Sequence, residues 1–231
     1  DPVTRLPNRL RFLSRLDAAV AAGQGAHLVV CDLDRFRQVN VTYGPRVADI
    51  GLAGVAERLR AVLSQAGLPG GFIGRIGADQ FGMILPGSSR EAVVALMSAA
   101  SSAIAEGFII EGQAMRLAAS FGAAHTPTDA TNGTDLLKLA EVALKEAKKQ
   151  TATRAAFFDQ RLLDKARAQS RLEEELRDGL DRGEFVAVFQ PKVKLETGEL
   201  VGAEALARWR RPDGAIVSPG VFIPIAEDLG L

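Results

Sequence analysis

The amino-acid sequence predicts an α+β fold in which helices cover a central, mostly antiparallel sheet. Apolar residues recur every three or four positions in several stretches, which is typical of amphipathic helices. Between these stretches lie short apolar runs that favour strands. Some neighbouring runs are separated only by a few polar or glycine residues, so we expect hairpins and therefore antiparallel pairing.

The first half of the chain alternates between these two patterns. Helical spacing predicts a helix over residues 6–22, and the continuous apolar run 28–33 predicts a buried strand. A second apolar stripe predicts a helix around residues 52–63. Residues 72–75 and 81–85 flank a tight polar segment, so we expect a hairpin that presents a polar turn.

The following segments continue the same alternation. Ser88-Ser89-Arg90-Glu91 has the pattern of a capping box and predicts a helix that continues to about Glu106. Residues 108–110 and 115–124 are expected to pair as a second hairpin around Glu111-Gly112. Thr134 is expected to cap a helix that extends to Ala147.

The composition changes at Gln160, where a charged amphipathic helix begins. Two strands are then expected over residues 185–195 and 200–209. We therefore predict two domains, residues 1–159 and residues 160–231.

The overall composition excludes several classes of protein. Lys plus Arg and Asp plus Glu both number 28, which argues against nucleic acid or an anionic membrane surface as the main partner. The single cysteine, Cys31, lies in an apolar run and is expected to be buried, so no disulfide forms and a cytoplasmic location is expected. No apolar run approaches the roughly 20 residues of a membrane span. His27 and His125 lack further ligands at metal-binding spacing and are interpreted as structural. We expect both ends to be cut from a longer protein, because the chain opens within a motif.

Five blocks of the sequence resemble the diguanylate cyclase (GGDEF) family, in its order and at its spacing. The resemblance covers residues 1 to about 158. The blocks are Asp1–Arg9, Asp32–Asn40, Arg75–Phe81, Ser120–Gly122 with Pro127 and Asp129, and Ala143–Leu144 with Ala147–Lys148.

The resemblance implies that a ribose hydroxyl of one GTP attacks the α-phosphate of a second GTP, with one domain of a homodimer supplying each half. Two divalent cations, Mg²⁺ or Mn²⁺, would offset the phosphate charge and would need oxygen ligands. The residues that match the family's sites are the metal ligands Asp32, Leu33 (backbone carbonyl) and Asp79, the last also catalytic, and the substrate-binding residues Asn40, Asp49, Arg75 and Lys148. Asn40 and Asp49 match a reader of guanine, and Lys148 matches a phosphate contact.

The same residues also have ordinary structural interpretations. Asp32 and Asp34 could be carboxylates that cap a loop at a strand end. Asp79 and Gln80 could form a polar hairpin turn, and Lys148 could be a solvated lysine of the last helix.

The signature departs from the family pattern in ways that predict an impaired site. Gln80 replaces a glutamate, which removes one negative charge near the metals. Ala78 replaces a glycine, and a Cβ there would cost about 1 kcal/mol if the residue needed a positive φ. The product-inhibition motif, an Arg-x-x-Asp, would fall on Leu68 and Gly71 and is absent. Further departures from the family residues are at Val41, Pro45, Ala48 and Thr151-Ala152.

The end of the chain resembles the opening of the EAL phosphodiesterase family. The blocks that carry this resemblance are Phe189–Val193, Gly202–Trp209 and Pro219–Glu227. It implies that Glu204 is a catalytic metal ligand and that Gln190 and Arg208 bind substrate; the rival interpretation of Glu204 is an exposed residue of an ordinary strand. A complete β/α barrel takes roughly 200 residues or more. Residues 160–231 are therefore expected to be the N-terminal fragment of such a barrel, unable to hydrolyse cyclic-di-GMP alone, and to dock on the first domain or another chain.

Three hypotheses for function follow, with GTP and cyclic-di-GMP as the candidate ligands. In the first, the cyclase-like domain is a GTP-binding or scaffold module that regulates a phosphodiesterase completed in the longer parent. In the second, both domains are non-catalytic and bind cyclic-di-GMP as a receptor. In the third, the first domain is a slow but genuine cyclase.

Overall fold

The computed structural model describes residues 1–110, 112–150 and 153–231. The chain divides into two compact units, residues 1–163 and 164–231, and each has its own apolar core. The predicted domain division after residue 159 stays a prediction. Of the helices in the described residues, none combines the length and the apolar character that crossing a bilayer requires.

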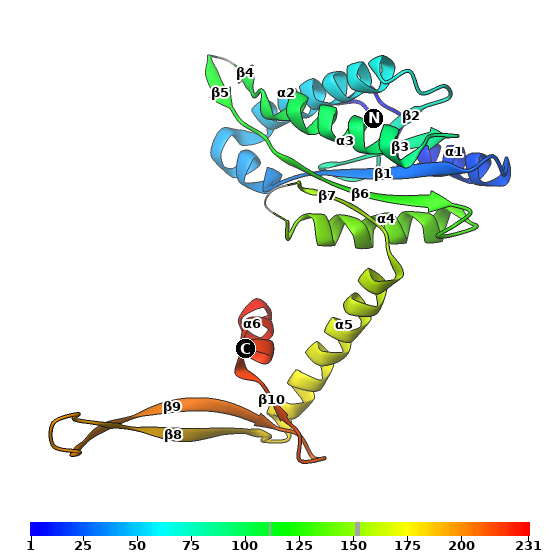
Figure 1. The fold of residues 1–231 in the computed structure, drawn as a ribbon. Helices are drawn as coiled ribbons and strands as arrows, with labels where there is room; N and C mark the ends of the chain where they lie inside the picture. Colours follow the sequence, from blue (N-terminus) through cyan, green and yellow to red (C-terminus); the bar gives the residue numbers. More distant parts are fainter. Residues whose placement is uncertain (111, 151–152) are drawn as a thin grey trace. The chain divides into compact units, whose positions relative to one another are not determined.

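A five-stranded sheet forms the centre of the first unit, in the order β2-β3-β1-β6-β7 (Figure 1). The central strand β1 (Ala26–Leu33) pairs antiparallel with β3 (Gln80–Pro86) and with β6 (Ala119–Thr126). β2 (Phe72–Arg75) also pairs antiparallel with β3, whereas β7 (Ala155–Phe157) runs parallel to β6. The prediction of a mostly antiparallel sheet flanked by helices is confirmed.

Two helices cover each face of this sheet. Because side chains alternate along a strand, Val29 and Cys31 of β1 join the core under α2 and α3, while Leu28 and Val30 join the core under α1 and α4. The thiol of Cys31 is buried, as expected. The helices are α1 (Arg9–Ala21), α2 (Phe36–Gln65), α3 (Arg90–Ala105) and α4 (Gly133–Ala147).

Two opposed glycines explain how α1 packs on the sheet. Gly74 of β2 and Gly82 of β3 are direct partners across the ladder. A Cβ added to Gly74 would lie 2.8 Å from the Phe12 ring, and one added to Gly82 would lie 2.4 Å from it. The missing side chains therefore make the space in which the fully buried Phe12 sits.

The second helix differs from the prediction. The apolar stripe predicted a helix near residues 52–63, but α2 begins at Phe36 and continues through Pro45. Gly44 has φ 81° and ψ 163°, so the helix is kinked there. A glycine followed by a proline normally indicates a break in a helix, so the sequence did not predict the first turns of α2.

The two predicted helices α3 and α4 both form, but their N-caps differ from the predicted ones. The N-cap of α3 is Ser89, whose side chain accepts a hydrogen bond from the Ala92 amide, whereas the Ser88 hydroxyl donates to the Leu85 carbonyl. The N-cap of α4 is Asn132 rather than Thr134, because the Asn132 side chain reaches the Asp135 amide.

The predicted strand over residues 115–124 is divided between two sheets. Its start belongs to β5 (Gln113–Met115), which pairs only with β4 (Phe108–Ile110). Residues 119–124 belong to β6 of the central sheet, and residues 116–118 belong to neither strand. Of the predicted Glu111-Gly112 turn, Glu111 lies outside the described residues, and Gly112 has φ 80°.

The second unit is a long antiparallel ribbon with a small core. β8 (Phe185–Val193) pairs with β9 (Leu200–Arg210), which also pairs with β10 (Ile216–Val217). Helices α5 (Gln160–Asp181) and α6 (Pro219–Leu229) supply the other core residues. The buried residues of this core are Leu176, Trp209, Phe222 and Ile225.

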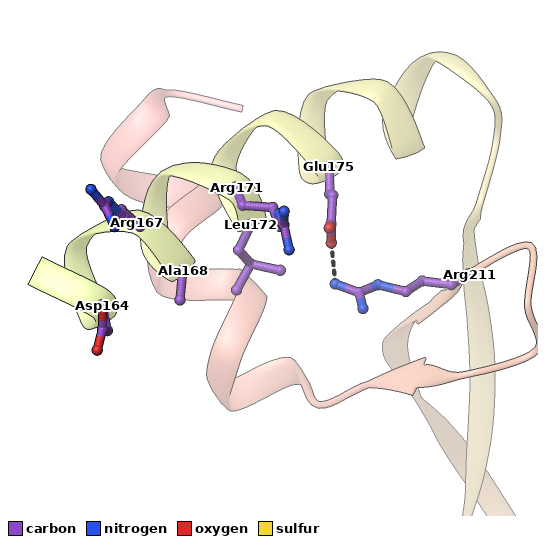
Figure 2. A pocket seen from close by; sticks show the side chains of 7 residues that line it. All are labelled: Asp164, Arg167, Ala168, Arg171, Leu172, Glu175 and Arg211. Carbon is purple, nitrogen blue, oxygen red and sulfur yellow. Dashed lines mark hydrogen bonds and ion pairs between the residues drawn. The ribbon is translucent and has the colours of Figure 1, made fainter. Parts of the chain in front are cut away.

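One side of α5 lines a pocket of about 630 Å³ in this unit (Figure 2). Arg211 reaches it from the segment after β9 and forms an ion pair with Glu175. On the ribbon, Phe189 is 69% exposed and Leu200 is 65% exposed. The predicted docking of this fragment stays a prediction.

A pair of histidines on neighbouring strands gives the first unit a predicted pH dependence. His27 of β1 lies directly opposite His125 of β6, with ring centroids 4.4 Å apart, and its Nδ1 lies 3.0 Å from the Ser88 hydroxyl. Burial, reinforced by His125, lowers the pKa of His27 from 6.5 to about 4. The folded state therefore favours the neutral ring, so this stabilisation is complete above pH 6.5 and is lost as the pH falls towards 4.

We expect the free energy of unfolding to fall by about 2 kcal/mol between pH 7.5 and pH 5 because of His27. Urea denaturation of the whole chain, followed by circular dichroism, measures this change. His27→Gln keeps a polar partner for Ser88 but cannot be protonated, so its stability should change much less over this range. An equal fall in the variant would show that other groups are responsible.

Candidate active site

The centre of the candidate site is the carboxylate of Asp32, which is buried at the end of β1. One of its oxygens lies 2.5 Å from the Lys148 ammonium. The other accepts a hydrogen bond of 2.9 Å from the side-chain amide of Gln80, the residue directly opposite Asp32 on β3. Both oxygens of this carboxylate therefore already have partners within the chain.

The second acid of the strand end is compensated in the same way. Asp34 accepts a hydrogen bond of 2.8 Å from the Ser120 hydroxyl and forms an ion pair with Arg154. Arg154 is not among the residues that the sequence predicted for the site. The family arginine would fall on Ala152, which together with Thr151 lies outside the described residues. Arg154 is the first arginine after that position, and this closeness in the sequence could have identified it as the partner of Asp34.

Asp79 lies in the turn between β2 and β3, as the hairpin prediction required. Its backbone carbonyl accepts a hydrogen bond of 3.1 Å from the Leu33 amide, which fixes the turn against the end of β1. Burial, and then the negative charge of Asp32, raise the pKa of the Asp79 carboxyl. The charge of Asp32 thus disfavours ionisation of the Asp79 carboxyl.

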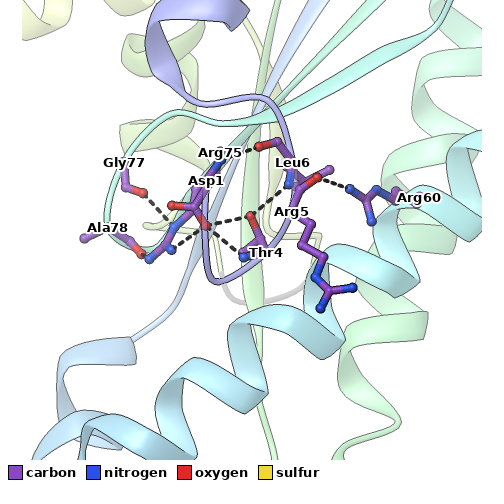
Figure 3. A network of polar contacts seen from close by, with 8 residues as sticks. All are labelled: Asp1, Thr4, Arg5, Leu6, Arg60, Arg75, Gly77 and Ala78. Atoms are coloured by element: carbon purple, nitrogen blue, oxygen red, sulfur yellow. Dashed lines mark hydrogen bonds and ion pairs between the residues drawn. The ribbon is translucent and has the colours of Figure 1, made fainter.

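Arg75 holds this turn in place (Figure 3). Its guanidinium donates to the Gly77 carbonyl at 3.2 Å and to the Ala78 carbonyl at 2.5 Å, and it forms an ion pair of 3.0 Å with Asp1. The same Asp1 oxygen accepts hydrogen bonds from the backbone and hydroxyl of Thr4. Arg75 thus positions the turn, and its predicted contact with substrate stays a prediction.

The expected strain at Ala78 does not arise. Among the described residues, the positive-φ residues other than glycine are Arg5, Arg35 and Arg154, so Ala78 tolerates its Cβ. The departure that changes the chemistry of the turn is therefore Gln80. Its side-chain amide donates to Asp32, whereas the glutamate of the family pattern would repel that carboxylate.

The residues expected to read guanine are on α2. Asn40 and Asp49 are both exposed, and they lie on opposite sides of the kink at Gly44. The structure does not bring them to the Asp32 cluster through any contact in the described part of the chain, and their role stays a prediction.

The predicted phosphodiesterase residues share one face of the β8–β9 ribbon. Gln190 and Glu204 are directly opposite each other in the register, and Arg208 follows on the same face of β9. The Glu204 carboxylate lies 3.2 Å from the Lys192 ammonium. The spacing of these residues in the sequence thus corresponds to a common surface in the structure.

The donor set at the end of β1 does not fit a two-metal centre. Within residues 1–110, 112–150 and 153–231, no group of three or more His, Cys, Asp or Glu side chains could hold a metal ion. Asp32, Asp79 and the Leu33 carbonyl would supply few of the oxygens that a hard cation needs. Because Lys148 pairs with one oxygen of Asp32 and Gln80 donates a hydrogen bond to the other, a cation would have to displace both of them.

Comparison with known proteins identifies both parts of the chain. The family described as "Diguanylate cyclase, GGDEF domain" matches residues 1–154, and the EAL domain family matches residues 173–231. The chain is 32% identical over 235 residues to the bifunctional diguanylate cyclase/cyclic di-GMP phosphodiesterase MucR of Pseudomonas aeruginosa, covering 100% of this chain and 34% of MucR. It is 30% identical to the cyclic di-GMP phosphodiesterase NbdA of the same organism, covering 100% of this chain and 30% of NbdA. The chain thus spans about a third of the length of these relatives.

Two solved structures share the fold of this chain. The GGDEF domain of TpbB (YfiN) from Pseudomonas aeruginosa matches with a TM-score of 0.67 and 24% identity, over 72% of this chain and 98% of that one. The S helix-GGDEF-EAL region of LapD from Vibrio cholerae, solved with cyclic-di-GMP, matches with a TM-score of 0.61 and 17% identity, over 99% of this chain and 53% of that one. Since the family match covers more than half of the sequence, the chain belongs to the diguanylate cyclase GGDEF-domain family and continues into the beginning of an EAL domain.

Proposed function

We propose that this chain is part of a cyclic-di-GMP signalling protein in which the GGDEF domain regulates instead of synthesising. In this proposal the domain acts as a GTP-binding or scaffold module for an EAL phosphodiesterase that is completed in a longer protein. The observation that carries the proposal is the Asp32 carboxylate, which is engaged on both oxygens by Lys148 and Gln80. The names of MucR and NbdA support the signalling role, because both refer to cyclic di-GMP.

The chemistry of synthesis explains why these contacts matter. A divalent cation, when bound, stabilises the charge that develops on the transferred phosphate. Here the ammonium of Lys148 supplies a single positive charge at Asp32, and the Gln80 amide supplies a neutral donor where the family pattern has an anionic ligand. Both oxygens of Asp32 therefore have partners before any metal binds, so binding a cation there gains less than at a free carboxylate.

We expect the chain to form no detectable cyclic-di-GMP from GTP with Mg²⁺ or Mn²⁺, and we expect Gln80→Glu to restore measurable synthesis. The added carboxylate would repel Asp32 and favour a cation between them. Product analysis by chromatography and the shift in melting temperature on adding Mn²⁺ are the two measurements. Gln80→Met has a similar size without charge and serves as the matched control.

Ala78→Gly should change neither measurement, because Ala78 does not have a positive φ. Rapid synthesis by the unaltered chain would overturn the proposal. Calorimetry with GTP then distinguishes a GTP-binding module from a scaffold module. If no binding is detected, only the scaffold role remains.

The intact Glu204 favours a phosphodiesterase over a purely non-catalytic receptor. Hydrolysis of cyclic-di-GMP by the longer protein, lost in Glu204→Ala, would support this choice. Binding without any hydrolysis would favour the receptor instead.

A further inference from the structure

The two edge strands of the central sheet differ in whether another segment covers them. At the β2 edge, the Arg75 amide donates a hydrogen bond of 2.9 Å to the Pro7 carbonyl, so the segment before α1 covers that edge. At the opposite edge, β7 (Ala155–Phe157) is the last strand of the sheet among the residues that the structure describes. An open edge is a template for the backbone of another segment.

The hydrogen bonds of β7 show which of its backbone groups are available. The Arg154 carbonyl accepts from the Phe121 amide at 2.8 Å, and the Phe158 amide donates to the Ala123 carbonyl at 2.7 Å, so these groups face β6. Because the direction alternates along a strand, the amides and carbonyls of Ala155 and Phe157 face away from β6. In the part of the chain that the structure describes, these outward groups have no backbone partner.

A groove of about 560 Å³ runs beside this edge, between β7 and α3. Its wall on α3 is formed largely by small hydroxyl side chains and by Val94, which is 50% exposed. Such a groove has room for the side chains of an extended segment, which alternate on either side of its backbone. The hydroxyl side chains on α3 are Ser98, Ser101 and Ser102.

The groove carries a positive charge at its Phe157 end. The Arg90 guanidinium lies 3.9 Å from the centre of the Phe157 ring. Within the described residues it makes no hydrogen bond or ion pair, while the Asp159 carboxylate beside this region is held by Arg161 at 2.7 and 3.0 Å. The charge of Arg90 also interacts with the Glu91 and Asp159 carboxylates, so what Arg90 offers to an incoming carboxylate is its set of N–H donors.

We propose that the β7 edge and its groove bind an extended peptide segment of a partner protein, which adds a strand to the sheet and places an acidic residue against Arg90. Main-chain hydrogen bonds to Ala155 and Phe157 would supply affinity, and the groove and Arg90 would supply selectivity. The residues that line the groove include none of the Asp32 cluster, so the proposal does not rest on GTP binding by the domain.

The test uses the whole chain and two synthetic twelve-residue peptides of alternating threonine and valine, one with a central glutamate and one with a central lysine. Fluorescence anisotropy should show the glutamate peptide binding at least about tenfold more tightly. Arg90→Glu should reverse that preference. Ala155→Pro removes an outward amide and spares the bonds to β6, so it should weaken binding of the glutamate peptide at least about tenfold.

Hydrogen exchange provides a measurement that does not depend on the variants folding well. In the free chain the amides of Ala155 and Phe157 should exchange faster than that of Ala156, and the glutamate peptide should slow them. Slow exchange before any peptide is added would overturn the proposal, as would equal binding of both peptides or no binding. A dimer that Ala155→Pro dissociates would also overturn it, by assigning the edge to a second copy of the chain.

Discussion

Gly122→Val will unfold the first unit or destabilise it by at least about 3 kcal/mol. Gly122 is at the centre of β6, where α4 crosses the strand in direct backbone contact. A Cβ at this position would lie 2.2 Å from the Ala140 carbonyl oxygen and 2.2 Å from the Leu144 amide nitrogen. Both atoms belong to the helix backbone, so no side-chain rotation can relieve the clash, and the whole helix would have to move.

The displacement would also reach the candidate site. Lys148 follows directly after α4, and its ammonium contacts Asp32 only while the helix keeps its position. Urea denaturation measures the loss of stability. Gly202→Ala is the matched control, since Gly202 is also a strand glycine but has nothing within 4 Å of an added Cβ, and it should change stability by less than about 0.5 kcal/mol. Equal stability of Gly122→Val and the parent chain would contradict the packing described for α4.

Trp209→Ala will unfold the second unit. Trp209 is fully buried, stacks on Phe185 with ring centroids 5.2 Å apart, and meets Phe222 edge-on at 6.0 Å. Its indole nitrogen donates a hydrogen bond of 2.9 Å to Glu184. Truncation of a buried aromatic costs about 3 to 5 kcal/mol, and this small core has few other large side chains with which to compensate.

Hydrogen exchange of the β8 and β9 amides measures this loss, because the variant lacks the only tryptophan and cannot be followed by its fluorescence. Trp209→Phe retains an aromatic ring without the hydrogen bond and should lose only part of the protection. The amides of β1 serve as an internal control in the same experiment. Full protection of the ribbon in Trp209→Ala would show that other contacts hold it.

Much of the fold was predictable because the apolar pattern of the sequence agrees with the burial of the same residues in the structure. The apolar run that became β1 is buried along its whole length, and the residues flanking the polar turn became β2 and β3 as expected. The first turns of α2 were missed because Gly44 and Pro45 indicate a break, while the packing of the helix tolerates a kink there. The division between β5 and β6 was missed because a continuous apolar pattern does not show which partner strand each part will join.

The candidate site was predictable in its positions but not in its contacts. The resemblance selected Asp32, Asp79 and Lys148 individually. That Lys148 and Gln80 both engage Asp32 depends on folding residues from three distant segments together, which no local pattern reveals. Arg154 was missed for the same reason, since its partner Asp34 lies far away in the sequence.

The opposed pair Gly74 and Gly82 has a consequence for how this sequence can diverge. The Phe12 ring fills the space over both glycines, so the residue type at each of these three positions limits what the other two can be. A homologue with a side chain at either strand position needs a smaller residue on α1, and a homologue that keeps the aromatic ring must keep both glycines. Substitutions at these sites are therefore expected to be correlated, although β1 and α2 separate Phe12 from the two glycines along the chain.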